Sequence, residues 1–499
     1  MTYADLQNGS DIRGIAIATT DENVTLTAAT VKAVASGLHH WLASKGTGPF
    51  RVAVGRDSRL SGEALQQVLM SQLQAEGIDV IDCGMATTPA MFMSTQFSDF
   101  ACDAGVMLTA SHLPYYFNGI KIFSREGGAE KEDIQYILTH TEPTLSDVSG
   151  TYQQQDLLTP YAADLVAKIR QGIGTTEWQP LSGLKIIVDA GNGAGGFFAE
   201  KVLIPLGADT NGSQFLEPDG HFPNHIPNPD NKEAMKSITD AVLREQADLG
   251  IIFDTDVDRS AVVTQSGAPL NRNNMIAVLS KIVLAAHPGT KIVTNSPTSD
   301  HLKRFIESLG GQQVRYISGY RNVINKAITL NEAGDDVQLA IETSGHAAFK
   351  ENYFLDDGAY VIAKILMILP ELQAQGTSLD DLIATLQQPA ETQELRFKIN
   401  TPDYQNYGRQ LIADFGSINQ PGWTIDPENE EGIRFKVSAP YGNGWFLLRM
   451  SLHEPLLVLQ IENDALGHLP AIVQKISQFL DRYPAIDQSK LRDFLSEQK

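Results

Sequence analysis

Cysteine is almost missing from this sequence, which has two, Cys83 and Cys102, among 499 residues. So few cysteines build no disulfide framework, and their spacing fits no metal site, so we expect a reduced pair. Long apolar runs are missing as well: the run 361–369 is far shorter than the ~20 residues of a membrane helix. The first residues hold no basic segment followed by an apolar one and predict no signal peptide. We therefore expect a cytoplasmic protein that has no membrane partner.

Basic residues are also scarce, because 38 Lys and Arg stand against 60 Asp and Glu and leave a net charge of -22. A nucleic-acid partner is not expected, since it would need a basic face that neutralises phosphates. An anionic substrate would need specific Arg, Lys and His residues in loops to overcome the global field. With 42% hydrophobic and 20% charged residues the composition is that of a globular protein, and the length predicts three or four domains.

Short β-branched runs alternate with helical patterns along most of the chain, which predicts α/β units with mostly parallel sheets. Strands are expected at 104–110, 247–253 and 337–343, and polar residues follow each of them. Ligands of open α/β sheets bind at the carboxyl ends of the strands, so these loops are the candidate sites. The last part differs: runs at 394–400, 432–438, 445–451 and 456–462 predict an antiparallel sheet, with helices near 404–415 and 467–482.

The acidic cluster DTDVDR at 254–259 directly follows an apolar run. Carboxylates at every second position of an extended loop point the same way and repel one another. A hard divalent cation removes that repulsion, and Mg²⁺ prefers a few carboxylates together with a phosphate oxygen. We therefore predict a metal site at Asp254, Asp256 and Asp258. Arg259 is expected to neutralise part of the remaining negative charge or to bind a phosphate. The alternative is a solvated acidic loop.

The sequence TASHLP places Ser111 at the end of a buried strand, where nucleophiles are often displayed. His112 and Lys121 are candidate acid/base or phosphate-holding partners. Taken alone, the pattern is also that of an ordinary turn.

Two further loops carry polar residues that suit a phosphorylated sugar. In ETSGH (342–346), Glu and Ser side chains can bind neighbouring sugar hydroxyls, and the glycine allows a close backbone approach. In RMSLHEP (449–455), Arg449, Ser451 and His453 can bind a phosphate. Either loop alone is equally well read as a surface loop.

Taken together and in this order, the four loops resemble those of the α-D-phosphohexomutase superfamily. TASHLP is similar to its TASHNP-type phosphoserine loop, DTDVDR to its DGDxDR metal loop, ETSGH to its GExSG sugar loop, and RMSLHEP to its RxSGTEP-type phosphate loop. SDIRG (10–14), GRDSR (55–59), DAGNG (189–193) and 217–230 resemble further family segments. The run 344–360 looks most like the phosphomannomutase/phosphoglucomutase branch.

The resemblance implies an α/β protein of four domains around a central cleft, three of them similar α/β domains and the last a smaller α+β phosphate-binding domain. The implied domains are 1–150 with the phosphoserine loop, 151–267 with the metal loop, 268–390 with the sugar loop, and 391–499 with the phosphate loop. Phosphorylated Ser111 would interconvert hexose 1-phosphates and hexose 6-phosphates of mannose or glucose. The implied cofactors are Mg²⁺ and a hexose 1,6-bisphosphate as activator and intermediate. The implied assembly is a monomer or dimer.

The resemblance also implies roles for single residues. The catalytic residues are Ser111, His112, Lys121 and Arg13; the metal ligands are Ser111, Asp254, Asp256 and Asp258; the sugar-binding residues are Glu342, Ser344, His346 and Arg321; and the phosphate-binding residues are Arg259, Arg449, Ser451 and His453.

Several positions depart from the family pattern. Leu113 replaces an Asn, Thr255 a Gly, and Leu452 and His453 a small residue and a Thr. The loop TNSPTSD (294–300) has no basic residue where several relatives carry a base candidate. Arginine stays protonated, so proton transfer is assigned to Lys121 and substrate binding to Arg321.

Three alternatives to this function stay open. The first is a phosphoglucosamine mutase, because the sugar loop does not fix the substituent at C2. The second is a phosphosugar-binding paralogue without turnover, to which the altered phosphate loop points. The third is a phosphatase with Asp254 as nucleophile, which would leave the other motifs unexplained.

Overall fold

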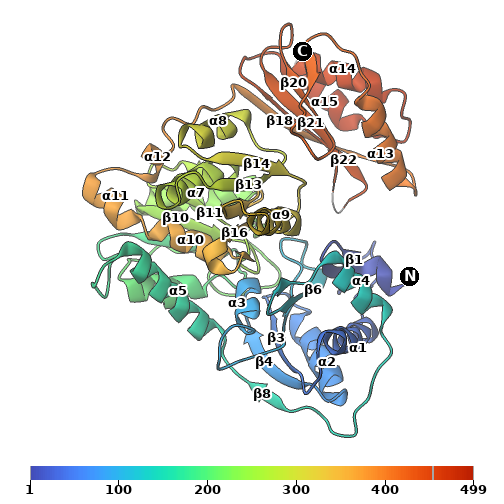
Figure 1. Ribbon diagram of the computed structural model, residues 1–499, viewed down its shortest axis with the longest axis vertical. Coiled ribbons are helices and arrows are strands. Elements are labelled where there is room, and N and C mark those ends of the chain that lie inside the picture. Colours follow the sequence, from blue (N-terminus) through green and yellow to red (C-terminus); the bar gives the residue numbers. More distant parts are fainter. Residues whose placement is uncertain (1, 452–453, 498–499) are drawn as a thin grey trace. The chain divides into compact units, whose positions relative to one another are not determined.

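The computed structural model describes residues 2–451 and 454–497. It divides into two compact units, one formed by the chain up to Leu279 together with Ser344–Leu382, and the other by Ser280–Thr343 and Ile383 onward. We call them unit 1 and unit 2. Figure 1 labels their helices and strands. Every helix among the described residues is too short or too polar to cross a membrane.

The first sheet of unit 1 has eight strands, seven of which follow the order β1-β2-β6-β5-β3-β4-β8, while β7 pairs with β6. Its strands are β1 (Gln7–Asn8), β2 (Asp11–Ile15), β3 (Arg51–Arg56), β4 (Asp79–Met85), β5 (Ala104–Leu108), β6 (Phe117–Ser124), β7 (Gly127–Gly128) and β8 (Tyr152–Gln154). The helices of this region are η1 (Tyr3–Leu6), α1 (Ala28–Lys45), α2 (Gly62–Ala75), α3 (Thr88–Met93) and α4 (Lys131–Thr139), and α5 (Leu158–Ile173) follows β8 and leads to the second sheet.

This sheet is parallel from β5 through β3 and β4 to the edge strand β8 and antiparallel on the other side, whereas the sequence predicted a mostly parallel one. β3 pairs in parallel with β4 and β5, but β6 runs antiparallel to β5. The loop 109–116 between β5 and β6 is too short for the crossover that a parallel pair needs, so the chain turns back on itself. Because β6 runs back along β5, Lys121 of β6 pairs with Met107 of β5, the strand that leads into Ser111.

The second sheet of unit 1 has the order β12-β11-β10-β9. Its strands are β9 (Ile186–Asp189), β10 (Leu249–Phe253), β11 (Ser260–Thr264) and β12 (Pro269–Leu270), and its helical segments are η2 (Phe198–Leu203), η3 (Ile204–Leu206) and α6 (Lys232–Glu245). β10 is buried throughout and is followed directly by the acidic loop. Strands β10 and β11 form an antiparallel pair, so the acidic loop is a tight connection between two strands.

Unit 1 also includes a segment that follows the sugar loop, and α7 (Arg272–Ala286) continues from unit 1 into unit 2. The segment holds β16 (Ala347–Phe349), η4 (Lys350–Asn352), β17 (Leu355–Asp356), α10 (Gly358–Leu366), α11 (Leu369–Gln375) and α12 (Leu379–Leu382). β16 and β17 form an antiparallel pair.

Unit 2 begins with a parallel arrangement in which β13 lies between β14 and β15. Its elements are β13 (Lys291–Asn295), α8 (Asp300–Ser308), β14 (Gln312–Tyr316), α9 (Tyr320–Glu332) and β15 (Val337–Ile341). The predicted strand at 337–343 and the α/β character of this region are confirmed.

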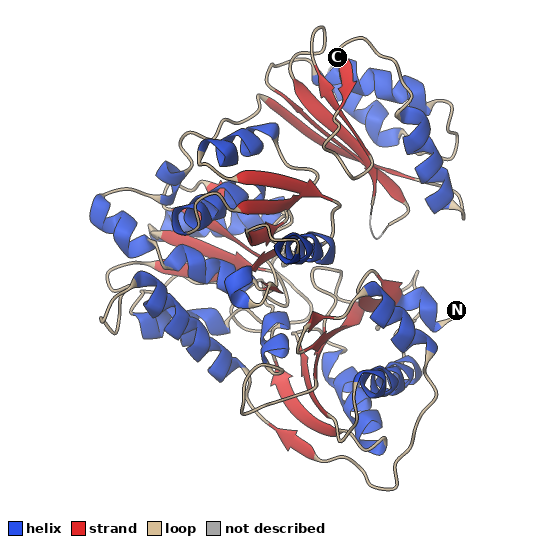
Figure 2. Ribbon diagram, in the orientation of Figure 1, coloured by secondary structure: helices blue, strands red, loops and turns tan. Residues whose placement is uncertain are grey.

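The C-terminal part of unit 2 is an antiparallel sheet of order β18-β22-β21-β20-β19. Its elements are β18 (Glu391–Lys398), α13 (Tyr404–Phe415), β19 (Trp423–Ile425), β20 (Ile433–Val437), β21 (Gly444–Met450), β22 (Leu456–Asn463), α14 (Leu469–Leu480) and α15 (Ser489–Glu497). Figure 2 shows its three helices gathered on one face of the sheet. The predicted α+β C-terminal domain is therefore confirmed.

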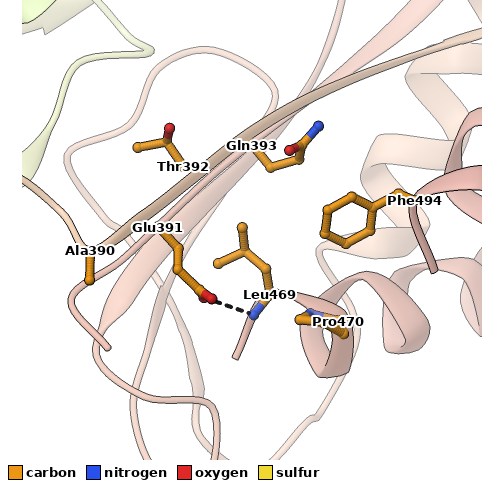
Figure 3. Close-up of a pocket in the computed structure, with 7 residues that line it drawn as sticks. All are labelled: Ala390, Glu391, Thr392, Gln393, Leu469, Pro470 and Phe494. Atoms are coloured by element: carbon orange, nitrogen blue, oxygen red, sulfur yellow. Dashed lines mark hydrogen bonds between the residues drawn. The ribbon is translucent and has the colours of Figure 1, made fainter. Parts of the chain in front are cut away.

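A shallow pocket of about 300 Å³ opens at the end of this sheet and contains none of the predicted site residues. Figure 3 shows that the Glu391 carboxylate points at the backbone nitrogen of Leu469 at the start of α14. It also accepts hydrogen bonds from the backbone N–H groups of Gly467 and His468. A carboxylate at this position satisfies N–H groups that have no partner within the helix, so Glu391 is explained as a helix cap.

The sheets reach slightly beyond two of the predicted domain boundaries. β8 joins the first sheet at 152–154, past the boundary at 150, and β12 extends the second sheet to Leu270, past the boundary at 267. The boundaries themselves stay a prediction.

The core of the C-terminal domain predicts where its stability comes from. Phe415 is 0% exposed, and its ring centroid lies 4.8 Å from Phe479 and 5.7 Å from Phe435. Phe415→Ala removes this buried ring and is expected to destabilise the domain by about 3–5 kcal/mol. Thermal unfolding should show a transition lowered by several degrees, whereas Leu466→Ala, at a side chain that is 76% exposed, should leave it unchanged. Equal effects of the two variants would contradict this account.

Candidate active site

Ser111 lies just past the end of β5 in a strained turn. Its side chain is buried and its φ is +50°, a left-handed conformation that non-glycine residues adopt rarely and chiefly where the surroundings enforce it. The backbone N–H of Ser111 donates to Thr109 Oγ1 at 2.9 Å. The turn therefore fixes the direction of the serine hydroxyl.

The side chain of Arg59 stabilises this turn through hydrogen bonds to its backbone. The Arg59 guanidinium is buried and donates to the backbone carbonyls of Ser111 and Leu113, the latter at 2.7 Å. It also donates to the carbonyls of Pro114 and Phe117, both at 2.9 Å. One planar side chain thus satisfies four carbonyls and replaces the regular backbone pairing that the loop lacks.

The Ser111 hydroxyl meets the acidic loop directly. Ser111 Oγ donates to Asp254 Oδ2 at 2.9 Å and accepts from Arg259 Nη2 at 3.0 Å. Arg259 Nε also donates to Asp254 Oδ2 at 3.0 Å. The structure therefore brings Ser111 into contact with two residues of the acidic loop that lie 143 and 148 positions further along the chain, as the family resemblance implies.

The acidic loop is itself held in an unusual conformation. Val257 is buried and has a φ of +68°, which is an outlier for a β-branched residue. Its carbonyl accepts from the N–H of Gly358 at 3.1 Å, and the carbonyl of Asp256 accepts from the N–H of Thr88 at 2.8 Å. A side chain on Gly358 would lie 2.7 Å from the carbonyl carbon of Arg259, so the close approach requires glycine there.

The three acids of this loop fit a divalent metal. One oxygen of each of Asp254, Asp256 and Asp258 can be chosen so that all lie within 4.8 Å of one another. Among the described residues, Asp256 Oδ1 and Asp258 Oδ1 are buried and have no hydrogen-bond partner. Buried carboxylate oxygens without partners are costly, and a hard cation is the ligand that oxygen donors of this kind satisfy. The donor set therefore fits the Mg²⁺ that the family resemblance implies.

Lys121 supplies positive charge to the same acids. Its ammonium group is buried, lies 3.2 Å from Asp256 Oδ2 and also contacts Asp258 Oδ2. Arg13, the other predicted basic residue of this region, is paired with Asp11 at 2.8 Å on β2.

The electrostatic balance differs between the three acids. Burial and the neighbouring charge of Asp258 raise the pKa of Asp254 well above its usual value. Burial acts in the same direction on Asp258, but Lys121, followed by His346 and Arg259, outweighs it and holds the pKa of Asp258 below its usual value. The two ends of the triad therefore lie in opposite electrostatic settings, one dominated by burial and the other by neighbouring cations.

His112 is a neutral imidazole in this environment. Burial, followed by the charges of Arg259 and Arg13, lowers the pKa of His112 to about 2. Its Nδ1 lies 2.7 Å from Arg259 Nη2, which can only donate, so Nδ1 accepts this hydrogen bond. The predicted acid/base role of His112 stays a prediction, but this electrostatic setting favours a role in orienting Arg259.

His346 is paired with Asp356, a residue that was not predicted to belong to the site. His346 Nδ1 lies 2.6 Å from Asp356 Oδ2 and 3.9 Å from Asp258 Oδ1. Burial alone would lower the pKa of His346, but Asp356 and then Asp258 outweigh burial and raise it to about 9. His346 is therefore a cation at neutral pH, beside the metal loop. Ser344, also in unit 1, lies two residues before it.

Unit 2 carries the remaining predicted site residues. Glu342 is buried and accepts from the backbone N–H of Gly319 at 2.7 Å, two residues before Arg321. Arg449 Nη1 lies 3.7 Å from Glu431 Oε1, and Glu431 Oε2 accepts from the hydroxyl of Ser318 at 2.7 Å. Ser451 follows β21. His453, predicted to bind phosphate, lies outside the described residues.

Several residues that contact the predicted site had no assigned role in the sequence, among them Thr88, Asp356 and Arg59. Thr88 Oγ1 donates to Asp256 Oδ2, Asp356 pairs with His346, and Arg59 supports the Ser111 turn. Arg59 and Asp356 lie in segments that resemble the family, GRDSR and the run after the sugar loop, and this was the signal that could have identified them. Thr88 lies in none of the motifs quoted above.

Comparisons with known proteins agree with one another. The three α/β/α domains of the phosphoglucomutase/phosphomannomutase family match residues 4–145, 160–267 and 271–389. A phosphomannomutase/phosphoglucomutase of Pseudomonas putida is 32% identical over 428 residues, which are 85% of each chain. A phosphoglucomutase of Neisseria gonorrhoeae is 30% identical over 96% of this chain and 97% of its own length. A solved structure of a phosphoglucomutase/phosphomannomutase family protein from Burkholderia thailandensis has a TM-score of 0.78 at 27% identity, and covers 97% of this chain and 98% of its own.

The metal site predicts a response to magnesium. Millimolar Mg²⁺ should raise the temperature of thermal unfolding by a few degrees, because a ligand of the native state stabilises it by mass action. Asp256→Asn removes one carboxylate and should abolish most of that increase. Asp240→Asn, at an exposed acid on α6, should respond to Mg²⁺ as the original chain does. An undiminished increase in Asp256→Asn would contradict the assignment.

The raised pKa of His346 predicts a pH dependence in metal-free buffer. The folded-state value of about 9 exceeds the ordinary 6.5, so its stabilising effect is fully present below pH 6.5 and is lost as the pH rises through about 9. The free energy of unfolding, measured in EDTA against denaturant, should therefore fall over this range. The fall should be smaller in His346→Gln and unchanged in the exposed control His140→Gln. A fall that His346→Gln does not reduce would exclude His346 as its source.

Proposed function

Because this chain belongs to the phosphoglucomutase/phosphomannomutase family of intramolecular phosphotransferases, we propose that it interconverts the 1-phosphates and 6-phosphates of glucose, mannose or both. The observation that carries this proposal is the contact of the Ser111 hydroxyl with Asp254 and Arg259, at the edge of an acid triad with unpaired oxygens. A phosphoryl carrier needs these three features: a held hydroxyl, a metal site and a fixed cation.

We propose that phosphorylated Ser111 donates its phosphoryl group to the hydroxyl of a hexose monophosphate. The bond between Ser111 Oγ and phosphorus breaks as the bond from the sugar oxygen forms, which gives a hexose 1,6-bisphosphate and the serine hydroxyl. Return of the other phosphoryl group to Ser111 gives the isomeric monophosphate. Asp254, Asp256 and Asp258, together with phosphorylated Ser111, would hold Mg²⁺, which would supply neutralising charge for the transferred group.

Arg259 takes part on the protein side of this reaction. Its Nη2 already lies 3.0 Å from Ser111 Oγ, and it stays protonated, so it is placed to hold an oxygen of the phosphoryl group. We propose that Lys121, in its neutral amine form, takes the proton of the attacking sugar hydroxyl, which requires its ammonium group first to give up a proton from its ion pairs with Asp256 and Asp258. We propose that Arg13 adds positive charge beside it. His112, neutral and bonded to Arg259, keeps Arg259 in place.

The remaining residues are proposed to bind the rest of the substrate. Glu342, Ser344, His346 and Arg321 would hold sugar hydroxyls, and Arg449, Ser451 and His453 would hold the phosphate that is not transferred. Hydroxyl-binding side chains and a separate phosphate site suit a substrate that must be held in two orientations, since either end then reaches the same serine.

The other readings differ from this one in measurable ways. Both carboxylate oxygens of Asp254 already accept hydrogen bonds, Oδ1 from the backbone N–H of Arg259 and Oδ2 from the Arg259 and Ser111 side chains. Burial also raises its pKa, so Asp254 is a poor nucleophile, which disfavours a phosphatase. A phosphoglucosamine mutase would prefer the 2-amino sugar, and a binding paralogue would isomerise nothing.

We propose the cytoplasm as the location and leave monomer or dimer as a prediction.

The serine variant tests the reaction. Ser111→Ala should lower mutase activity by about 10³-fold or more, because the phosphoryl carrier is lost. A coupled assay on the 1-phosphates of glucose, mannose and glucosamine, with Mg²⁺ and with or without a hexose 1,6-bisphosphate, measures this and ranks the sugars. The control Ser98→Ala lies on the surface of the same domain and should keep full activity.

Intact-mass analysis of the purified protein separates the alternatives. A gain of about 80 Da that maps to Ser111 supports the mutase, and the same gain on Asp254 supports a phosphatase. Undiminished activity of Ser111→Ala would overturn the proposed mechanism. Binding of phosphosugars without turnover, even with bisphosphate and Mg²⁺, would identify the inactive paralogue.

A further inference from the structure

His225 lies in the segment 217–230, which resembled the family but received no role. The side chain is buried, and its Nε2 lies 3.0 Å from both carboxylate oxygens of Asp189 at the end of β9. Its Nδ1 lies 3.0 Å from the backbone carbonyl of Ile226. A carboxylate and a carbonyl can only accept, so both ring nitrogens must donate. The geometry therefore requires the doubly protonated, positively charged imidazole.

The surroundings of His225 support this charge. Burial lowers the pKa of His225, but hydrogen bonding to Asp189 and its charge, together with the Ile226 carbonyl, outweigh burial and raise it above the ordinary value. The Phe215 ring packs against the imidazole edge to face at 5.5 Å and carries no charge. Asp189, the charged group that faces His225, also accepts from the side chain of Gln214 at 2.7 Å.

The turn that follows His225 reaches the active site. Asn228 Oδ1 accepts from Arg259 Nη1 at 3.2 Å and from the backbone N–H of Asp230 at 3.0 Å. The backbone carbonyl of Asn228 accepts from the N–H of Asn231 at 2.9 Å, which closes the turn ahead of α6. Each end of the guanidinium of Arg259 thus has its own partner: Asn228 at Nη1, and Ser111 at Nη2.

We propose that His225 is a positioning residue for phosphoryl transfer, which as a cation bound to Asp189 fixes the turn at Asn228 and so holds Arg259 against Ser111. The proposal rests on the proposed function of Ser111 and Arg259. His225 touches none of the reacting atoms and acts through Arg259. Its effect is therefore expected on the chemical step and not on the binding of the sugar.

A second histidine of the same segment provides a matched control. His221 lies four residues before His225, its side chain is 66% exposed, and it pairs with exposed Asp219. At pH 6, His225→Gln should lower kcat by about 10- to 100-fold, the size found when a catalytic group loses its supporting contact, with KM changed less than about threefold. His221→Gln should change neither. A rise in KM at constant kcat in His225→Gln would overturn the proposal.

The pH profile separates positioning from a purely structural role. Because the pKa of His225 is raised by folding, the cation is present at and below pH 6.5 and is lost as the pH rises through the folded value. The ratio of kcat between the original chain and His225→Gln should be largest at pH 6 and should shrink at alkaline pH, where both side chains are neutral. A ratio that does not change with pH would exclude the cation as the active form.

A double-mutant cycle tests the route through Arg259. The loss of kcat in His225→Gln should become much smaller when Arg259→Lys is already present, because the two residues act on one contact. Additive losses would show that His225 acts elsewhere, and would overturn the proposal. Circular dichroism and thermal unfolding of each variant identify any that does not fold.

One measurement needs no variant activity and no mutase assay. In the NMR spectrum of the full chain, the His225 ring, assigned as the signal that disappears in His225→Gln, should titrate above pH 6.5 with both nitrogens protonated below that transition. A neutral ring at pH 6 would overturn the proposal even if the mutase reaction is confirmed. If the original chain shows no mutase activity, the proposed function fails by itself, and this titration still decides the state of His225.

Discussion

The mutual repulsion of three buried carboxylates is the constraint on which the rest of unit 1 depends. Asp254, Asp256 and Asp258 are at most 1% exposed and offer oxygens within 4.8 Å of one another. Such a cluster persists only beside compensating charge, since unpaired ions in the interior cost several kcal/mol each. Lys121 supplies part of that charge from β6 of the first sheet, and Arg259 supplies part from the acidic loop itself, which joins two strands of the second sheet. The packing of the two sheets of unit 1 and the charge balance of its site therefore depend on each other.

Backbone strain in the loops around the acid triad is the second consequence of this cluster. Two non-glycine residues with positive φ, Ser111 and Val257, lie on the two loops that meet at the triad. Each such residue costs on the order of 1–3 kcal/mol and persists only when its surroundings determine it. Arg59 supplies that determination for Ser111 through four carbonyls, and Gly358 and Thr88 do so for the acidic loop. A regular turn at Ser111 would point its hydroxyl away from the triad, and a regular turn in the acidic loop would point the carboxylates away from Ser111.

The sequence predicted the strand ends better than the contacts between them. Buried β5 and β10 carry an apolar run that ends abruptly in polar residues, so the positions of Ser111 and Asp254 were readable, and the family resemblance paired them. The antiparallel return of β6 was not predicted, because loop length rather than residue pattern decides it. The contact of Thr88 with Asp256 spans 168 positions, and a threonine at a helix start leaves no periodic signal of such a contact. The pairing of His346 with Asp356 was missed for the same reason: the short hairpin of β16 and β17 that brings them together is a tertiary feature.

Charge then explains why the metal and the phosphoryl group belong together. The chain carries a net charge of -22, yet its proposed carrier must accept a group with nearly two negative charges. Lys121, Arg259 and the His346 cation are offset by the triad and by Asp356, so these residues alone leave little net attraction for a phosphate. A divalent ion on the triad would reverse that balance, and a phosphate on Ser111 would in turn add an oxygen to the donor set. Each would therefore strengthen the binding of the other, and the position of Arg259, shared between Asp254, Ser111 and Asn228, would decide where the added negative charge comes to lie.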